Sequence, residues 1–415
     1  MHIHRNKATD KTMSHKTYLK ILNATSHDII NISVDGVDSH DWDGRSRPDR
    51  NSVGVSIPAG AWVEERQELS GGARSAWYSL HMTFANGQQI TLRNDQHDAH
   101  EEHNRSYGLT GPDADHFAAS QSSGKSLNTF SIEDRISPSK WMARVSGSQL
   151  LSQLSIPGTH DSGSYWSNIG NTHGQCQNLS IGRQLGAGIR LLDIRARHIE
   201  DRFTIHHGAI YQRINFDDVL DQCQGFLREN PAECILMLVN SEYDAEKVTR
   251  SFEDTFRDYV SRRSSASWYL GAHIPRLDDV RGKIVLLRRF PASAELGINL
   301  RKWGDNSTFS HTNSDGVTYH VTDRYRVDSA GDNKLAQVEN LMAAATADSR
   351  ADSLYIAFLS GSNPPDTPRS FAFNVNPRLH AHLLANHSSE RAGVIALDFC
   401  DNPSTLVKQI ILRNS

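Results

Sequence analysis

Apolar runs that alternate with amphipathic stretches place the strongest constraint on how the second part of this chain can fold. The run at 234–240 is apolar almost throughout, which is typical of a strand buried on both faces of a sheet. The stretch before it, 215–231, carries apolar side chains at helical spacing until Pro231 stops the pattern. Strands that alternate with helices favour a parallel sheet. Residues 138–415 are about as long as the roughly 250 residues of a (β/α) TIM-like barrel, and this α/β fold is our expectation.

The first part of the chain has a different pattern. Between residues 17 and 96, short segments rich in β-branched and aromatic residues recur between Gly, Asn, Asp and Pro. This spacing predicts a small all-β, sandwich-like accessory domain at 17–96. Residues 1–16 are polar and unpatterned, so we expect a disordered lead. Residues 97–137 are rich in Ser, Gly, Asp and His, which predicts a linker or a long loop before the barrel.

Composition excludes several classes of protein. The balance of 44 Lys+Arg against 48 Asp+Glu gives a net charge of −4, which is not the basic footprint of a nucleic-acid-binding protein. No stretch reaches the roughly 18 apolar residues of a membrane-spanning helix, so any membrane contact is expected to be peripheral. The start lacks the apolar core of a secretory signal, which leaves export by another route and a cytoplasmic location both open.

The four cysteines contain no CxxC pair and give neither a zinc nor a redox signature. Three of them, Cys223, Cys234 and Cys400, lie in apolar patterns, so buried thiols are expected. The sequence leaves the oligomeric state unassigned.

Polar residues directly follow, or lie within, several of the predicted strands, where the working residues of a barrel are found. Two histidines, an arginine and carboxylates in such positions suit acid–base chemistry on an anionic substrate. A neutral histidine can take a hydroxyl proton while a protonated histidine donates to a leaving oxygen. Both forms exist near neutral pH because the ordinary pKa of histidine is about 6.5. An arginine would offset the charge on the phosphoryl oxygens. The candidates for these roles are the histidines His160, His206 and His207, the arginines Arg195, Arg288 and Arg289, and the carboxylates Asp161, Asp193 and Asp398.

Five motifs follow one another in the second part of the chain. They are SIPGTHDSGSYW, LLDIRAR followed by TIHHG, GKIVLLRRF, VTDRYRV and ALDFCDNP. In this order they resemble the catalytic domain of bacterial-type phosphatidylinositol-specific phospholipase C, and the resemblance extends from about Trp141 to Asn414. It implies a distorted, incompletely closed barrel that cleaves phosphatidylinositol, or glycosylated phosphatidylinositol, to diacylglycerol and inositol 1,2-cyclic phosphate.

The same resemblance implies roles for the two histidines. His160 would be the general base on the inositol 2-hydroxyl, with Asp398 orienting it. His207 would be the general acid on the diacylglycerol oxygen, helped by Asp161. Because adjacent strand residues point to opposite faces, only one of His206 and His207 can face the site, and the resemblance favours His207.

Arg195 would hold the phosphate, with Asp193 supporting it. Metal-independent members of the family carry an arginine at this position, so the resemblance implies no metal and no other cofactor. For inositol binding, the family's arginine, aspartate and tyrosine match Arg289, Asp323 and Tyr325. The tyrosine ring would stack on the sugar.

Phosphatidylinositol in a membrane is the expected partner. Residues 360–373 are interpreted as a barrel-mouth loop in which Phe371 and Phe373 could contact the bilayer, with burial of both rings as the alternative. Asn240 and Ser241 replace lysines that family members often carry, so tolerance for phosphorylated or glycosylated inositol is unassigned.

Two other functions stay open. A barrel phosphodiesterase acting on glycerophosphodiesters or sphingolipids would hold a divalent cation with acidic side chains, where this chain has Arg195. A non-catalytic lipid- or glycan-binding protein would instead work through the β-rich domain.

Overall fold

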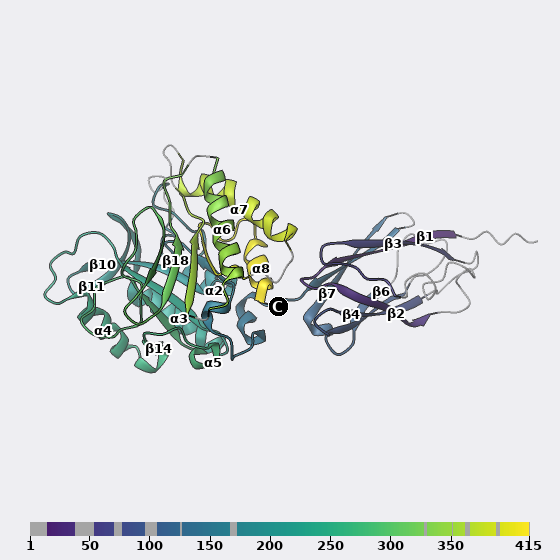
Figure 1. The fold of residues 1–415 in the computed structure, drawn as a ribbon, viewed down its shortest axis with the longest axis horizontal. Helices are drawn as coiled ribbons and strands as arrows, with labels where there is room; N and C mark the ends of the chain where they lie inside the picture. Colours follow the sequence, from purple (N-terminus) through teal and green to yellow (C-terminus); the bar gives the residue numbers. More distant parts are fainter. Residues whose placement is uncertain are drawn as a thin grey trace, which may run out of the picture. The chain divides into compact units, whose positions relative to one another are not determined.

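The structure is a computed structural model that describes most of the chain. The chain divides into two compact units, Met1–Ile136 and Ser137–Ser415, and each is described by itself (Figure 1). In the described part, no helix has the length and apolar character needed to cross a membrane. The described residues are 15–37, 54–69, 77–95, 106–124, 127–166, 172–327, 330–350, 352–361, 366–386 and 391–414.

The first unit is built from two four-stranded sheets, ordered β3-β1-β8-β7 and β2-β4-β5-β6 (Figure 1). Every second residue of β4 is fully buried, Leu80, Met82 and Phe84 among them, as expected for a strand with one face on a core. The strands are β1 His15–Ala24, β2 Ile29–Val37, β3 Trp62–Leu69, β4 Trp77–Phe84, β5 Gln89–Asp95, β6 Ser106–Thr110, β7 Phe117–Gly124 and β8 Leu127–Asp134, with a 3-10 turn at Ala114–His116.

The interpretation of residues 97–137 as a linker or a long loop is wrong. Strands β6, β7 and β8 lie in this segment, and β8 is an inner strand between β1 and β7. The prediction failed because Ser, Asp and Gly dominate the segment, yet a strand with one solvated face needs few apolar residues. Phe130 and Ile132 of β8 supply them and are fully buried. Residues 1–14 of the predicted disordered lead lie outside the described residues, and β1 begins at His15.

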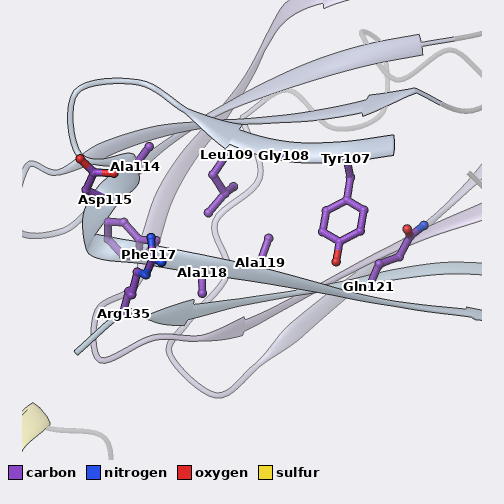
Figure 2. Close-up of a pocket in the computed structure, with 10 residues that line it drawn as sticks. All are labelled: Tyr107, Gly108, Leu109, Ala114, Asp115, Phe117, Ala118, Ala119, Gln121 and Arg135. Carbon is purple, nitrogen blue, oxygen red and sulfur yellow. The ribbon is translucent and has the colours of Figure 1, made fainter. Parts of the chain in front are cut away.

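A cavity of about 610 Å³ lies between β6 and β7, which are edge strands of the two different sheets (Figure 2). Tyr107 stands on one side, with its ring edge-on to Phe130 at 5.5 Å between centroids. Asp115 and Arg135 lie toward the other end, where Figure 2 shows them close to Phe117. The sandwich is therefore open along this side.

The second unit is a TIM-like barrel. Its strands follow the order β14-β15-β13-β10-β9-β20-β19-β18-β17, all parallel except β17, and the described pairings leave it open between β17 and β14. Strand β11 runs antiparallel to β10. The strands are β9 Ile156–Thr159, β10 Leu191–Ile199, β11 Arg202–His207, β12 Ile210–Asn215, β13 Ile235–Ser241, β14 Trp268–Tyr269, β15 Ile284–Arg288, β16 Ile298–Asn299, β17 Thr308–Thr312, β18 Thr318–Thr322, β19 Ser353–Phe358 and β20 Val394–Leu397.

Helices cover the outside of this barrel, with α6, α7 and α8 together on one side (Figure 1). The stripe predicted within 215–231 is buried in α3, where Val219, Leu220 and Cys223 are inaccessible to solvent. The helices are α2 Ile181–Gly186, α3 Phe216–Glu229, α4 Phe252–Arg262, α5 Leu277–Val280, α6 Asp332–Ala347, α7 Pro368–Ala385 and α8 Leu406–Ile411, with 3-10 turns at Pro138–Arg144, Leu151–Gln153, Ser265–Ser267 and Leu412–Asn414.

The expectation that Phe371 and Phe373 both lie in a loop is also wrong. Helix α7 begins at Pro368, and the Thr367 hydroxyl caps it by accepting a hydrogen bond from the Ser370 backbone N–H. Both phenylalanines are therefore helical. Phe371 is buried, whereas the side chain of Phe373 is 42% exposed.

Candidate active site

Most of the residues predicted to carry chemistry meet where strands β9 and β20 end, beside the middle of the adjacent strand β10. Thr159 pairs with Leu397 across β9 and β20, so the residues that follow them, His160 and Asp398, are neighbours. On the other side, Thr159 pairs with Leu192 of β10, whose next residues lead to the arginine and aspartate of the LLDIRAR motif. The register of the sheet thus assembles the site.

Two contacts fix the ring of His160. Its Nδ1 lies 2.8 Å from Asp398 Oδ1, and its Nε2 lies 2.8 Å from Nη2 of Arg195. An arginine can only donate, so in the neutral ring Nε2 accepts and Nδ1 donates its proton to Asp398. Burial lowers the pKa of His160, but the charge and hydrogen bond of Asp398 outweigh burial and raise this pKa above its ordinary value. The neutral ring is therefore a base with its lone pair on Nε2.

Asp193 links the arginine to the turn after β9. Arg195 Nε donates to Asp193 Oδ2 at 3.3 Å, and the Asp161 backbone N–H donates to the same oxygen at 3.0 Å. Burial raises the pKa of Asp193, but the charges of Arg195 and His160 outweigh it, and the pKa falls below its ordinary value. A charged Asp193 thus holds both the guanidinium and the backbone of Asp161, whose φ is +40°.

His207 faces the cluster at the end of β11, and Asp161 is its acidic neighbour. Asp161 Oδ2 lies 3.1 Å from His207 Nδ1. Burial raises the pKa of Asp161 to about 6, and burial together with Arg195 lowers the pKa of His207 to about 4. His206 points elsewhere and packs against Tyr211 at 5.5 Å between ring centroids. Of the two histidines, His207 is therefore the one brought to this cluster.

Of the three residues predicted to bind inositol, Arg289 and Asp323 contact the same side chain, whereas Tyr325 has a different partner. The Arg289 guanidinium lies 4.1 Å over the Trp303 ring, and Trp303 Nε1 donates to Asp323 Oδ2 at 2.9 Å. Trp303 therefore joins Arg289 to Asp323. Tyr325 turns its hydroxyl to Asp305, to which it donates at 3.0 Å.

Arg288, which immediately precedes Arg289, points away from the site. It is buried, and its guanidinium donates to the carbonyl oxygens of Leu296 at 2.8 Å and Phe290 at 2.6 Å. The alternation of side chains along a strand explains why only Arg289 faces the candidate site.

Two further residues join the site that the sequence interpretation did not include. Glu242 Oε1 accepts from the backbone N–H of Gly208 at 2.9 Å and so holds the turn after His207. It directly follows β13, so the strand-end argument applied to the other residues would have identified it. Trp303 follows β16, a strand of only two residues, and has no comparable signal.

Cys176 is the third residue that was not anticipated at this place. All four cysteines are buried and free, as expected for Cys223, Cys234 and Cys400. The Sγ atom of Cys176 lies 3.6 Å from Nδ1 of His207, and burial raises the pKa of this thiol well above its ordinary value.

Among the described residues, two groups of three side chains could hold a metal ion. One is His160, Cys176 and Asp398, and the other is Asp161, Cys176 and His207. In each group the ligand atoms lie within 4.8 Å of one another. Both groups share the same sulfur atom.

The geometry supports acid–base chemistry on a bound anion. Burial lowers the pKa of Arg195, but the charges of Asp193 and Asp161 together raise it by more. The pKa therefore lies well above its ordinary value, and the guanidinium stays charged. One histidine contacts Arg195 directly, and the other belongs to the same cluster through Asp161. A phosphate on Arg195 would have a basic nitrogen and a proton donor within reach.

Comparisons with known proteins find one family for the second part of the chain. Residues 154–290 match the family model described as phosphatidylinositol-specific phospholipase C, X domain. The 1-phosphatidylinositol phosphodiesterase of Staphylococcus aureus (strain Newman) is 31% identical over 279 residues, which cover 63% of this chain and 88% of the relative. The enzyme of the same name from Listeria monocytogenes serovar 1/2a is 32% identical over 306 residues, covering 70% and 90%.

Two solved structures show the same likeness. A crystal structure of phosphatidylinositol-specific phospholipase C from Staphylococcus aureus aligns with a TM-score of 0.63 at 29% identity, covering 67% of this chain and 98% of that one. The Listeria monocytogenes structure aligns with a TM-score of 0.57 at 27% identity, covering 68% and 100%.

Proposed function

The chain belongs to the bacterial phosphatidylinositol-specific phospholipase C family, and from that premise we propose how its barrel cleaves phosphatidylinositol to diacylglycerol and inositol 1,2-cyclic phosphate. The observation that carries the proposal is the set of contacts around Arg195, with Nε2 of His160 at 2.8 Å and Asp193 on its other side. These contacts bring together His160 as the base and Arg195 as the phosphate-binding cation. Asp161 adds His207 as the proton donor to the same cluster.

The first step is the attack of the inositol 2-hydroxyl on phosphorus. The substrate phosphate binds Arg195 and draws Nη2 away from His160, which frees the Nε2 lone pair. Nε2 takes the hydroxyl proton while the new O–P bond forms. Asp398, 2.8 Å from Nδ1, then stabilises the imidazolium.

The second part of the reaction is the departure of diacylglycerol. The bond from phosphorus to the diacylglycerol oxygen breaks, and His207 donates the proton that this oxygen needs. Nδ1 faces Asp161 and Cys176, so Nε2 is the nitrogen available to the leaving group. Proton exchange with water afterwards returns both histidines to their starting forms.

The inositol ring binds on the side of the site formed by the ends of β15 and β18. Arg289 and Asp323, already joined through Trp303, supply a donor and an acceptor for ring hydroxyls. Tyr325 lies two residues beyond Asp323, and we assign its ring to the sugar face. The cation that offsets phosphate charge is Arg195 itself, so the reaction as proposed needs no metal ion.

Contact with the membrane is assigned to the start of helix α7. Phe373 is exposed there, and Arg369 lies over its ring at 4.9 Å. Arg369 also donates to Asn178 Oδ1 at 3.4 Å and lies over Phe399, the residue after Asp398, and these contacts support our assignment of this pair to the mouth of the site. An exposed ring beside a cation suits a surface of lipid phosphates.

The decisive test is an assay for water-soluble inositol phosphate released from phosphatidylinositol vesicles in EDTA. The wild-type protein should release it, and His160→Ala should lower the turnover by roughly 10²- to 10⁴-fold, as expected for loss of a general base. His273→Ala, at an exposed histidine away from the cluster, is the matched control and should keep full activity. Unchanged turnover in His160→Ala would refute the assignment, as would inactivity of the wild type.

A further inference from the structure

The thiol of Cys176 has no part in the chemistry proposed above, although it lies against His207. We propose that Cys176, His207 and Asp161 form an inhibitory binding site for Zn²⁺ or a similar thiophilic divalent ion. The proposal rests on the proposed function, because inhibition follows from the role of His207. It adds a mode of regulation in which the ion removes the proton donor without closing the substrate site.

The distances fit the coordination of zinc. With bonds of about 2.3 Å to sulfur and about 2.0–2.1 Å to nitrogen and oxygen, tetrahedral zinc places S and N about 3.6 Å apart and N and O about 3.4 Å apart. Cys176 Sγ lies 3.6 Å from His207 Nδ1, and Asp161 Oδ2 lies 3.1 Å from the same nitrogen. The third pair, Cys176 Sγ and the Asp161 carboxylate, lies within 4.8 Å. A cation could therefore bind all three atoms once the sulfur and the carboxylate lie about 3.6 Å apart, and a water molecule would complete the tetrahedron.

A second observation points to a ligand here. Asp161 is fully buried, and neither of its carboxylate oxygens makes a hydrogen bond of normal geometry among the described residues, although the nearby Ser164 hydroxyl acts to lower its pKa. The 3.1 Å separation from His207 is an ion-pair distance without hydrogen-bond alignment. A buried carboxylate without hydrogen bonds is unfavourable, and a bound cation would satisfy it.

The donor set selects the class of metal. A thiolate, an imidazole and a carboxylate suit Zn²⁺, Co²⁺ or Cd²⁺, whereas Mg²⁺ and Ca²⁺ prefer oxygen ligands only. The alternative group, with His160 and Asp398, is less suited. Its Nδ1 and Oδ1 are 2.8 Å apart in a hydrogen bond, and the charged Arg195 donates to the other nitrogen of His160.

Inhibition follows from which nitrogen the ion occupies. A metal on Nδ1 of His207 prevents the ring from carrying two protons, and a metal-bound neutral imidazole is a much weaker acid than an imidazolium. The ion also neutralises Asp161, which otherwise supports the positive ring. Because Nε2 still faces the substrate, bound metal should lower kcat more than it changes KM.

The experiment uses the full chain, freed of metal with EDTA and transferred to chelator-free buffer. Zn²⁺ is titrated by calorimetry, and Co²⁺ is titrated while thiolate-to-cobalt charge-transfer absorption is recorded. Turnover is measured in parallel on a water-soluble phosphatidylinositol analogue, which avoids binding of the metal to vesicles. We expect one Zn²⁺ per chain, a charge-transfer band with Co²⁺, at least a tenfold loss of kcat at saturation, and no response to Mg²⁺.

Variants separate the thiol from the rest of the chain. Cys176→Ser should lose the Co²⁺ band and become at least tenfold less sensitive to Zn²⁺ while staying active in EDTA. Cys223→Ala, at a buried cysteine of helix α3, should behave as wild type. Absence of the Co²⁺ band from the wild type would overturn the proposal whether or not Cys176→Ser folds, and so would unchanged Zn²⁺ inhibition of a folded Cys176→Ser protein. Failure of the proposed function gives a different result, namely no turnover in EDTA.

Discussion

At His207, burial and Arg195 lower the pKa to about 4, although the reaction that we propose needs this ring protonated. The conflict is resolved by the substrate. A phosphodiester bound to Arg195 adds a negative charge where the free site has a positive one, and this removes one of the causes that lower the pKa of His207. Proton donation is thereby coupled to occupation of the site.

The dependence of kcat/KM on pH should be bell-shaped, with an optimum between about pH 6, the pKa of Asp161, and the raised pKa of His160. His160 must be neutral to act as a base, so activity falls as the pH drops through its raised pKa. Asp161 and His207 titrate as a coupled pair, and this pair loses its proton as the pH rises through about 6, the pKa of Asp161. Initial rates on a water-soluble analogue in EDTA measure the profile.

Asp161→Asn tests the assignment of the two limbs. Removal of the carboxylate destabilises the protonated His207, so the alkaline limb should move to lower pH while the acidic limb, which belongs to His160, stays in place. A flat profile in the wild type, or a shift of the acidic limb alone in the variant, would contradict these roles.

The sequence identifies candidate residues at the ends of strands better than those in irregular segments. His160, Asp161 and Asp398 follow apolar runs directly, so a local pattern marks their position at the ends of strands. Cys176 and Trp303 lie in irregular segments, and only the tertiary fold brings the thiol to His207 and the indole to Arg289. Such contacts have no local signal, because they depend on loops whose course the strand pattern does not determine.

Among elements, strand periodicity decides which of two neighbouring candidates faces the site. His206 and His207, and likewise Arg288 and Arg289, point to opposite sides, and one of each pair is packed away from the site. The same two-residue period also explains the failure at β8. Its buried residues alternate with Ser and Glu, and a polar composition hid a strand that has one face on a core.

Helix α7 is the element that we expect to contact the membrane. Phe373→Ala should weaken binding to phosphatidylinositol vesicles by ~5-fold, equivalent to about 1 kcal/mol for a half-exposed ring that enters the interface. Its kcat on a water-soluble analogue should not change, because the ring touches no reacting group. Vesicle sedimentation measures the binding.

Leu384→Ala is the control, since Leu384 is similarly exposed near the other end of the same helix and its replacement should leave binding unchanged. Equal losses in both variants would argue against a specific contact at the mouth.

At the scale of the whole molecule, chemistry and accessory structure are separated. Every candidate catalytic and inositol-binding residue lies in the unit 137–415. The first unit has a hydrophobic core of its own, in which Leu80, Phe84 and Ile132 are fully buried. Its cavity, lined by Tyr107, Asp115 and Arg135 among others, belongs to the sandwich alone. Each unit therefore has the core that independent folding requires.

Removal of residues 1–136 should leave the barrel folded and catalytically complete. We expect its kcat on a water-soluble phosphatidylinositol analogue to stay within ~2-fold of the full chain, because the groups assigned to the proton transfers lie in the barrel and the first unit has a hydrophobic core of its own. Rates on vesicles, compared between the full chain and the barrel, then isolate what the first unit adds at a membrane. A truncated protein that is folded by circular dichroism but inactive on the soluble analogue would show that the β-rich unit takes part in catalysis, contrary to this separation.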